Sequence, residues 1–244
     1  MAYDIRSITQ VGTSEPFELQ MSRGQIPGHS VLHKFGAVPS MSTGQSGTVW
    51  DVDDTDYPWA SWVTTGTLSI PAVVGNDGLE LIIEGLDADY NIQTQTVTIS
   101  DTVLTPVSGT WARVYRVYCT SATNTADVLI QKGGVTVAKI NANKGQTLMA
   151  IYTVPADYTA YIIKGTATCQ ANADATGDMF IRYFGQNSFR VGHSFEVSGT
   201  GGQYNYDFAF PSKLPAKSDI DVRAAVRSNN ARVTAAFDIM LVRS

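Results

Sequence analysis

The sequence predicts an all-β protein, an antiparallel β-sandwich of the jelly-roll type with an extended N-terminal arm. Three observations lead to this prediction. Short runs rich in β-branched and aromatic residues alternate with polar residues along most of the chain. Clusters of Gly, Pro, Asn and Ser separate these runs, as they do in turns between strands. A chain of 244 residues is also long enough to bury a full hydrophobic core without a metal or a disulfide.

Residues 1–45 are predicted to form the extended arm. Glycine and proline interrupt this segment, and its apolar residues follow no sustained period. Such an arm would leave apolar side chains in water unless it lies on its own sandwich or on a neighbouring subunit. We therefore expect contacts between subunits here. The candidate interface residues are Phe17, Leu19, Ile26, Leu32 and Phe35.

Residues 46–244 are predicted to form the sandwich, and a sub-boundary near residues 145–150 is left open. The first expected hairpin joins residues 79–84 to residues 91–100 through the loop GLDADY. Its return strand, NIQTQTVTIS, alternates in the way that a pleated sheet requires. Residues 111–120, WARVYRVYCT, mix β-branched and aromatic residues and are predicted to form the next strand.

A second hairpin is expected between residues 127–131 and 135–140. The glycines of Lys132-Gly133-Gly134 can adopt the positive φ that a tight hairpin turn requires. Further strands are predicted at residues 148–154, 159–168, 178–184, 189–197, 204–210, 219–226 and 232–242. The last of these, ARVTAAFDIMLVR, contains Ala and Met, which favour a helix, but its Val, Thr, Phe and Ile favour a strand.

The composition bears on the partners of the protein. Charged residues make up 16% of the sequence, below the level of about 25% in soluble domains, so we expect a surface that partner subunits partly cover. The net charge of −5 and the lack of clustered Lys and Arg argue against nucleic-acid binding. The sequence shows no signal-peptide pattern and no apolar stretch that would span a bilayer, so neither secretion nor membrane insertion is expected. Cys119 and Cys169 lie in apolar runs and are expected to be buried free thiols.

Asp51, Asp53, Asp54 and Asp56 place four carboxylates in six residues, as loops that bind hard cations do. The EF-hand pattern fails, however, because Gly is missing at its sixth position and Glu at its twelfth. The alternative is a solvated loop of mutually repelling charges. These aspartates are a candidate cation site to which we assign no metal.

Three tryptophans flank this acidic loop. Trp50 precedes it, and Trp59 and Trp62 follow in the segment YPWASW. Such side chains pack in a core or at an interface, and stacking on a sugar ring is a less common use. We take Trp50, Trp59 and Trp62 as further candidate interface residues.

No catalytic residue and no cofactor site is predicted. His29 and His33 lie four residues apart, but nearby Pro and Gly argue against the helix that would bring both to one metal. His193 is expected at a partly exposed strand position. The sequence lacks the Gly-x-Ser-x-Gly motif of serine hydrolases. The segment Gly199-Thr200-Gly201-Gly202 lacks the Lys and the following helix of a phosphate-binding loop.

A series of short motifs also occurs in a fixed order along the chain. These motifs are Arg23-Gly24, Gly28-His29, Lys34-Phe35-Gly36, Val49-Trp50-Asp51, Gly85-Leu86-Asp87 with Asn91, Thr105-Pro106-Val107 and Tyr152 to Ala156. In this order the chain resembles a family of virion structural proteins from tailed bacteriophages, cyanophages among them. After about Cys169, only the strand character of the sequence matches.

The resemblance implies a jelly-roll protein on the exterior of a virion, made in the host cytoplasm, with no enzymatic activity and no cofactor. The implied role is that of a capsid decoration or cement protein, whose partners are the major capsid protein and neighbouring copies of itself. We expect a homotrimer, because capsids offer three-fold positions. Two alternatives stay open. One is a tail or fibre component that binds a host glycan through Tyr204 and Tyr206, and the other is a stand-alone carbohydrate-binding domain or hydrolase.

Overall fold

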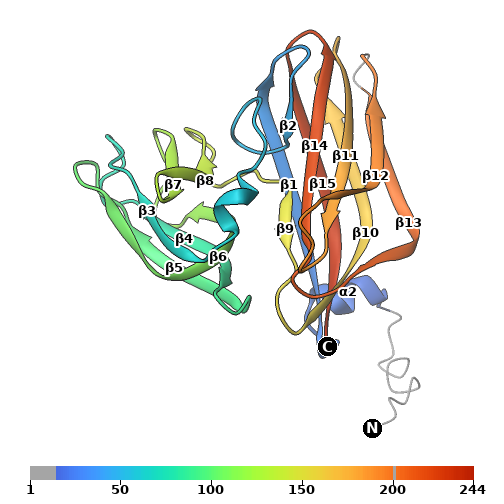
Figure 1. Cartoon of the computed structure of the whole chain (residues 1–244), viewed down its shortest axis with the longest axis horizontal. Helices are drawn as coiled ribbons and strands as arrows, with labels where there is room; N and C mark the ends of the chain where they lie inside the picture. The colour runs from blue at the N-terminus through green and yellow to red at the C-terminus, as the bar shows by residue number, and fades with distance from the viewer. Residues whose placement is uncertain (1–14, 200–201) are drawn as a thin grey trace.

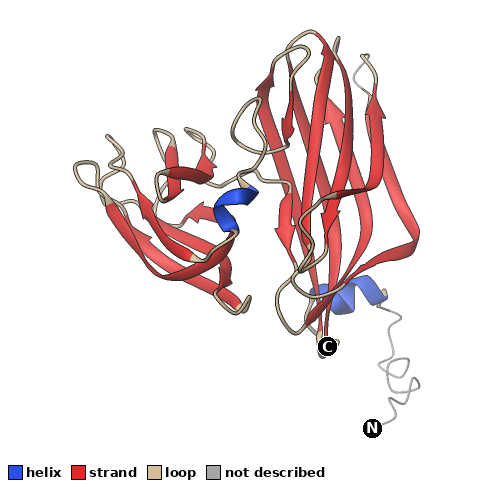
Figure 2. Cartoon of the chain, in the orientation of Figure 1, coloured by secondary structure: helices blue, strands red, loops and turns tan. Residues whose placement is uncertain are grey.

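The structure is a computed structural model that describes residues 15–199 and 202–244. It confirms the predicted fold class, because almost all of its regular structure consists of antiparallel strands (Figure 2). The helical segments in these residues are α2, Phe17–Ser22, and the 3-10 helix η1, Trp59–Trp62. The strands form two units, which Figure 1 shows as a tall sandwich with a smaller, curved sheet beside it.

The sandwich consists of a four-stranded and a five-stranded sheet. The first has the order β1-β15-β10-β13, and the second has the order β12-β11-β14-β2, with β9 also paired to β14. The bounds are β1, His29–Met41; β2, Ser46–Thr48; β9, Ile151–Thr153; β10, Tyr158–Cys169; β11, Asp174–Arg182; β12, Arg190–Val197; β13, Gln203–Leu214; β14, Asp219–Ser228; and β15, Ala231–Arg243.

β2 and β9 are two halves of one interrupted strand. Both pair antiparallel with β14, one after the other along its length. Between them, Val49 donates its N–H to the Val222 carbonyl at 2.8 Å, and Val222 donates to the Ala150 carbonyl at 3.1 Å. The Ala150 N–H in turn bonds the Val49 carbonyl at 2.9 Å. The chain therefore leaves a single strand at Val49 and returns to it at Ala150, and residues 50–149 are an insertion.

The strand order identifies the sandwich as a jelly roll. When β2 and β9 count as one strand and the insertion is left out, the strands can be numbered one to eight along the chain. The two sheets then have the orders 1-8-3-6 and 2-7-4-5. This is the arrangement of a jelly roll, in which two Greek keys close into two facing sheets.

Residues 50–149, which we call the insert, form a six-stranded antiparallel sheet. Its order is β5-β4-β6-β3-β7-β8. The bounds are β3, Gly66–Ile70; β4, Glu80–Asp87; β5, Ile92–Thr98; β6, Thr105–Cys119; β7, Val128–Lys132; and β8, Val135–Ile140. Both predicted hairpins are confirmed, as β4 with β5 and β7 with β8. The first is longer than expected, because residues 85–87 continue β4 instead of lying in the loop.

Each unit has its own hydrophobic core. Along β15, buried residues alternate with more exposed ones, so that Val233, Phe237 and Ile239 face the opposite sheet of the jelly roll. This period of two confirms the predicted strand and excludes the helical alternative. The core of the insert contains Trp111 with the aliphatic residues of β4 and β6. Both cysteines are free thiols: Cys169 is buried and Cys119 is partly exposed.

The predicted arm is wrong for residues 29–41. This segment is β1, an edge strand of the jelly roll that pairs with β15 along its length. Val38 and Met41 are fully buried, so β1 contributes to the core. Gly36 and Pro39 hide the alternation of β1 in the sequence. Residues 1–14 of the predicted arm lie outside the described residues.

No helix in residues 15–199 and 202–244 has the length and apolar character needed to cross a bilayer.

Candidate interaction sites

A buried ionic contact at Asp219 of β14 joins the insert to the jelly roll. Arg113 of β6 places Nε at 3.0 Å from Oδ1 and Nη2 at 3.2 Å from Oδ2. Arg182 of β11 donates from Nη2 to Oδ2 at 2.6 Å, and the Thr153 hydroxyl of β9 donates to Oδ1 at 2.6 Å. The side chains of Arg113 and Asp219 are only 6% and 4% exposed. One carboxylate therefore ties three strands of the jelly roll to the insert.

Asp221, two residues further along β14, adds a second contact between the units. Its carboxylate accepts hydrogen bonds from Trp59 Nε1 at 2.9 Å, the Thr48 hydroxyl at 2.8 Å and Arg223 Nε at 2.8 Å. Burial raises the pKa of Asp221 above its ordinary value, and the hydrogen bonds from these three donors oppose this effect. Because a buried charge that loses its partner is strongly destabilising, the two aspartates fix how the insert lies on the jelly roll.

The prediction that Trp50, Trp59 and Trp62 form contacts between subunits is wrong. All three are buried within the chain, and their indole N–H groups have intramolecular acceptors. The Trp59 ring centroid also lies 5.6 Å from Arg113 Cζ and 5.4 Å from Arg182 Cζ, which are cation–π distances. The tryptophans therefore pack between and within the two units of one molecule.

The other candidate interface residues divide by exposure. Phe17 and Leu19 of α2 and Phe35 of β1 are exposed. Ile26 and Leu32 are half-buried, and Leu32 packs against the jelly-roll core. The exposed three remain candidates for contact with another subunit.

The four aspartates of the candidate cation site bind different parts of the chain. Asp51 accepts hydrogen bonds from the Leu148 N–H and the Asn141 amide. Asp53 accepts one from the Ser40 N–H, and Asp54 accepts two from the N–H and hydroxyl of Ser42. Asp56 forms an ion pair with Arg223. Burial raises the pKa of Asp51 to about 8. No three metal-ligating side chains come together in residues 15–199 and 202–244. Asp53, Asp54 and Asp56 instead tie the start of the insert to the sandwich, and Asp51 binds within the insert.

The three histidines contact different kinds of group. His33 Nδ1 lies 2.5 Å from Asp238 Oδ1 on the outer face of the jelly roll, and His29 contacts a backbone carbonyl. His193 hydrogen-bonds the phenol of Tyr204. None of the three is hydrogen-bonded to a serine, threonine or cysteine side chain in the part of the chain that the structure describes.

Aromatic side chains gather on β12 and β13, which are edge strands of the two sheets. Tyr206 and Phe210 are exposed, whereas His193, Tyr204 and Phe208 are half-buried. We call His193, Tyr204, Tyr206, Phe208 and Phe210 the aromatic edge. The rings of Tyr204 and Tyr206 are parallel to within 5°, with centroids 6.4 Å apart, and Phe208 packs edge-on against Tyr206 at 4.8 Å. His193 lies 4.4 Å from Tyr206 and so links the two sheets. Phe210 is 90% exposed.

Sequence reasoning missed Arg113, Asp219 and Asp221. In their strands these residues occupy positions at which an alternating pattern expects polar, solvent-facing side chains. The insert covers that face of β14, and the jelly roll covers Arg113 of β6, which makes the positions buried. Arg113 and Asp219 are 106 residues apart, and no local signal in the sequence pairs them.

No family model matches the sequence, and no curated protein matches it. Among solved structures, a chain of the cowpea mosaic virus top component, described as naturally occurring empty particles, is 7% identical, with 71% of this chain and 82% of that chain aligned and a TM-score of 0.24. A chain of the infectious bursal disease virus Gx strain is 7% identical, with 88% of this chain and 73% of that chain aligned and a TM-score of 0.28. A chain of broad bean stain virus is 10% identical, with 74% of this chain and 86% of that chain aligned and a TM-score of 0.21. These are virus structures, but at such low TM-scores the likenesses carry no argument about this chain.

Proposed function

We propose that the protein is a non-enzymatic structural protein of a virion that binds the capsid exterior as a decoration or cement protein. Its partners are the major capsid protein and neighbouring copies of itself, arranged as a homotrimer, and it binds neither nucleic acid nor membranes. The observation that carries this proposal is the aromatic edge of the jelly roll, where Tyr206 and Phe210 are exposed beside the half-buried His193, Tyr204 and Phe208. The ordered motifs that resemble phage structural proteins supply the virion context.

The aromatic edge has the composition of a protein interface. Aromatic residues are enriched at interface cores, where each buries a large area with few rotamers to lose. Burial of apolar surface contributes about 25 cal/mol per Å², and a standard interface buries about 1,600 Å². On a capsid this gain is repeated at every copy, so a modest affinity at each site stabilises the shell as a whole.

Two measurements test the proposal. Size-exclusion chromatography with light scattering gives the oligomeric state of the purified chain, and sedimentation with capsid shells that lack the protein tests attachment. A trimer that coats the shells is the expected result. A monomer that sediments with no shell would contradict both parts of the proposal.

A variant pair then tests the surface. Phe210→Ser removes the most exposed aromatic side chain of the edge, and Val74→Ser is the matched control, since Val74 is 80% exposed but lies on the insert. We expect Phe210→Ser to weaken attachment or trimer formation about 10-fold or more, as hot-spot residues do. Val74→Ser should behave as the wild type. If the two variants attach to shells and form trimers equally well, the aromatic edge does not belong to the interface.

The stacked Tyr204 and Tyr206 favour a second candidate function, that of a tail or fibre component that binds a host-surface glycan. Sugar rings stack on exposed aromatic faces, and polar groups beside these rings could orient them. Binding of the protein to an array of bacterial surface glycans would measure this activity. Loss of glycan binding in Tyr204→Ala and Tyr206→Ala, together with failure to coat shells, would favour the second function over the first.

A further inference from the structure

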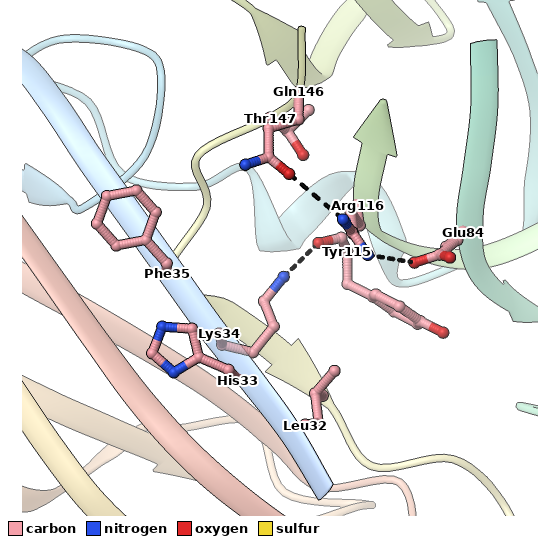
Figure 3. A pocket seen from close by; sticks show the side chains of 9 residues that line it. All are labelled: Leu32, His33, Lys34, Phe35, Glu84, Tyr115, Arg116, Gln146 and Thr147. Atoms are coloured by element: carbon pink, nitrogen blue, oxygen red, sulfur yellow. Dashed lines mark hydrogen bonds and ion pairs between the residues drawn. The ribbon is translucent and has the colours of Figure 1, made fainter. Parts of the chain in front are cut away.

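A polar pocket lies where β1 of the jelly roll faces β4 and β6 of the insert (Figure 3). Its volume is about 280 Å³. Leu32 and Lys34 enter it from β1, Glu84 and Arg116 from the insert, and Thr147 from the segment that leads back to β9. None of these residues belongs to the aromatic edge or to the ionic contact at Asp219.

Lys34 is the central cation of the pocket. The residue is 5% exposed, and its ammonium group has one acceptor in the described chain, the Tyr115 carbonyl at 2.5 Å. An ammonium group carries three donors, so two N–H groups have no acceptor there. Among the described residues, no carboxylate lies within ion-pair distance of Lys34, although buried charges are normally paired.

Other donors line the same pocket. The buried Thr147 hydroxyl accepts the Val117 N–H at 3.0 Å, and its own proton has no acceptor among the described residues. The Gln146 amide directs its oxygen to Arg116 at 3.4 Å, which leaves its NH₂ group as a donor toward the gap between the units in Figure 3. Glu84 is the carboxylate that lines the pocket, and it already forms an ion pair with Arg116 at 3.8 Å. The pocket therefore offers more donors than acceptors, and more positive than negative charge.

We propose that this pocket binds a carboxylate, that of an Asp or Glu side chain on a neighbouring subunit. A carboxylate accepts hydrogen bonds only, so it can satisfy Lys34 and Thr147 together. Its single charge matches that of Lys34, which has no carboxylate partner among the described residues. The apolar side chains of Leu32 and Phe35 at the pocket suit the short methylene stem of an acidic residue. That the carboxylate belongs to a neighbouring subunit rests on the proposed function, whereas the binding of a carboxylate does not.

Protonation of Lys34 supports this ligand class. Burial and the neighbouring Arg116 lower the pKa of Lys34 to about 7, and Glu84 partly opposes them. A carboxylate at the ammonium group would raise this pKa, so its binding is coupled to proton uptake and weakens above neutral pH. The other ionisable side chains that line the pocket are His33, Tyr115 and Arg116, together with Glu84.

Acetate is the probe for the first experiment. Thermal unfolding of the full chain is followed at a pH of about 6, in sodium acetate and in sodium chloride of equal ionic strength. Acetate at about ten times its dissociation constant should raise the Tm by about 4 °C. Lys34→Met should abolish this rise, because Met keeps the apolar stem and removes the charge. Lys132→Met is the matched control, since Lys132 also donates to a backbone carbonyl, that of Ser61 at 2.5 Å, but lies outside the pocket.

A second measurement needs no variant. Acetate should slow the acylation of Lys34 by an amine-reactive reagent several-fold, as read by peptide mass spectrometry, and should leave Lys132 unchanged. No protection of Lys34, or an equal Tm rise in Lys34→Met and the wild type, would overturn the carboxylate site. Stabilisation by inorganic phosphate but not by acetate, dependent on Lys34, would also overturn it in favour of a phosphate ligand.

Attachment to shells tests the origin of the carboxylate. We expect Lys34→Met to coat shells more weakly than Lys132→Met by about 10-fold or more, the usual loss when one partner of a buried charge pair is removed. Equal coating would overturn the assignment to a neighbouring subunit. If the wild type ignores shells but acetate still protects Lys34, the proposed function fails and the carboxylate site stands.

Discussion

Replacing Arg113 by Met is expected to loosen the insert from the jelly roll. Removal of one partner from a buried ion pair costs about 3–5 kcal/mol, because the other charge stays buried. Asp219 would keep Arg182 and the Thr153 hydroxyl as partners, both at 2.6 Å, so part of its charge stays compensated. We therefore expect Arg113→Met to lower the free energy of unfolding by about 3 kcal/mol, the low end of this range.

Asp219→Asn should lower the free energy of unfolding more than Arg113→Met does. It leaves both Arg113 and Arg182 without a carboxylate, and the Arg113 side chain is 6% exposed. The expected loss is about 4–5 kcal/mol, the upper end of the range. The double variant should lose less than the sum of the two single losses, since each single variant already breaks the pair.

Urea unfolding with two probes measures these losses. All four tryptophans of the chain belong to the core cluster of the insert and its junction, so their fluorescence reports that unit. Far-UV circular dichroism reports the strands of both units. For the wild type we expect the two probes to give coincident transitions, and for Arg113→Met we expect the fluorescence transition to shift to lower urea first.

Arg116→Met is the matched control on the same strand. The side chain of Arg116 is 46% exposed and lies 3.8 Å from Glu84, so its loss should cost less than about 1 kcal/mol. If Arg113→Met proves no more destabilising than Arg116→Met, or if the two probes stay coincident in every variant, the buried contact does not hold the two units together.

Three further predictions concern other parts of the fold. Burial raises the pKa of Asp51 from 3.8 to about 8, so the native state binds the proton more tightly than the unfolded state does. The free energy of unfolding therefore falls as the pH rises between these two values, by at most about 1.4 kcal/mol per pH unit. In urea titrations Asp51→Asn should remove this pH dependence, and an unchanged slope of the unfolding free energy against pH would refute the prediction. Gly36→Ala should destabilise by about 1–3 kcal/mol, because a Cβ would meet the Val49 oxygen at 2.2 Å, while Gly165→Ala, with no atom within 4 Å, should not. Deletion of residues 1–28 should leave Tm nearly unchanged, because β1 begins at His29, and a loss of folding would show that this segment belongs to the core.

The strands of the second half of the chain could be predicted because each carries its own alternation. In β11, for example, Ala175, Met179 and Ile181 face inward, and the side chains between them alternate to the more exposed face. β1 was missed for a physical reason. At Gly36 the strand passes so close to Val49 and Ala150 that only glycine fits, and this glycine interrupts the alternation that identifies a strand.

The insertion could not be predicted from the sequence. β2 is only three residues long and was not predicted, and β9 lies within the strand predicted at residues 148–154, but no local signal shows that the two belong to one strand. They become one strand through pairing with β14, which follows them by more than 60 residues along the chain. The candidate interface tryptophans failed for the same reason. Their aromatic character was read correctly as that of an interface, but the partner surface belongs to the same chain.

The way in which the insert is attached determines how a bound neighbour would act on the jelly roll. The chain enters and leaves the insert at adjacent residues, Val49 and Ala150, so these two links alone form one hinge at the edge of β14. The contact of Arg113 with Asp219 lies three residues along β14 from Val222, which bonds both links, and gives the insert a further attachment to the jelly roll. The carboxylate pocket lies on β1, the edge strand of the other sheet. Lys34 of β1 already donates to the Tyr115 carbonyl of the insert at 2.5 Å. A carboxylate held there would add hydrogen bonds at this contact, so binding of a neighbouring subunit would stiffen the junction of the two units without any change of fold.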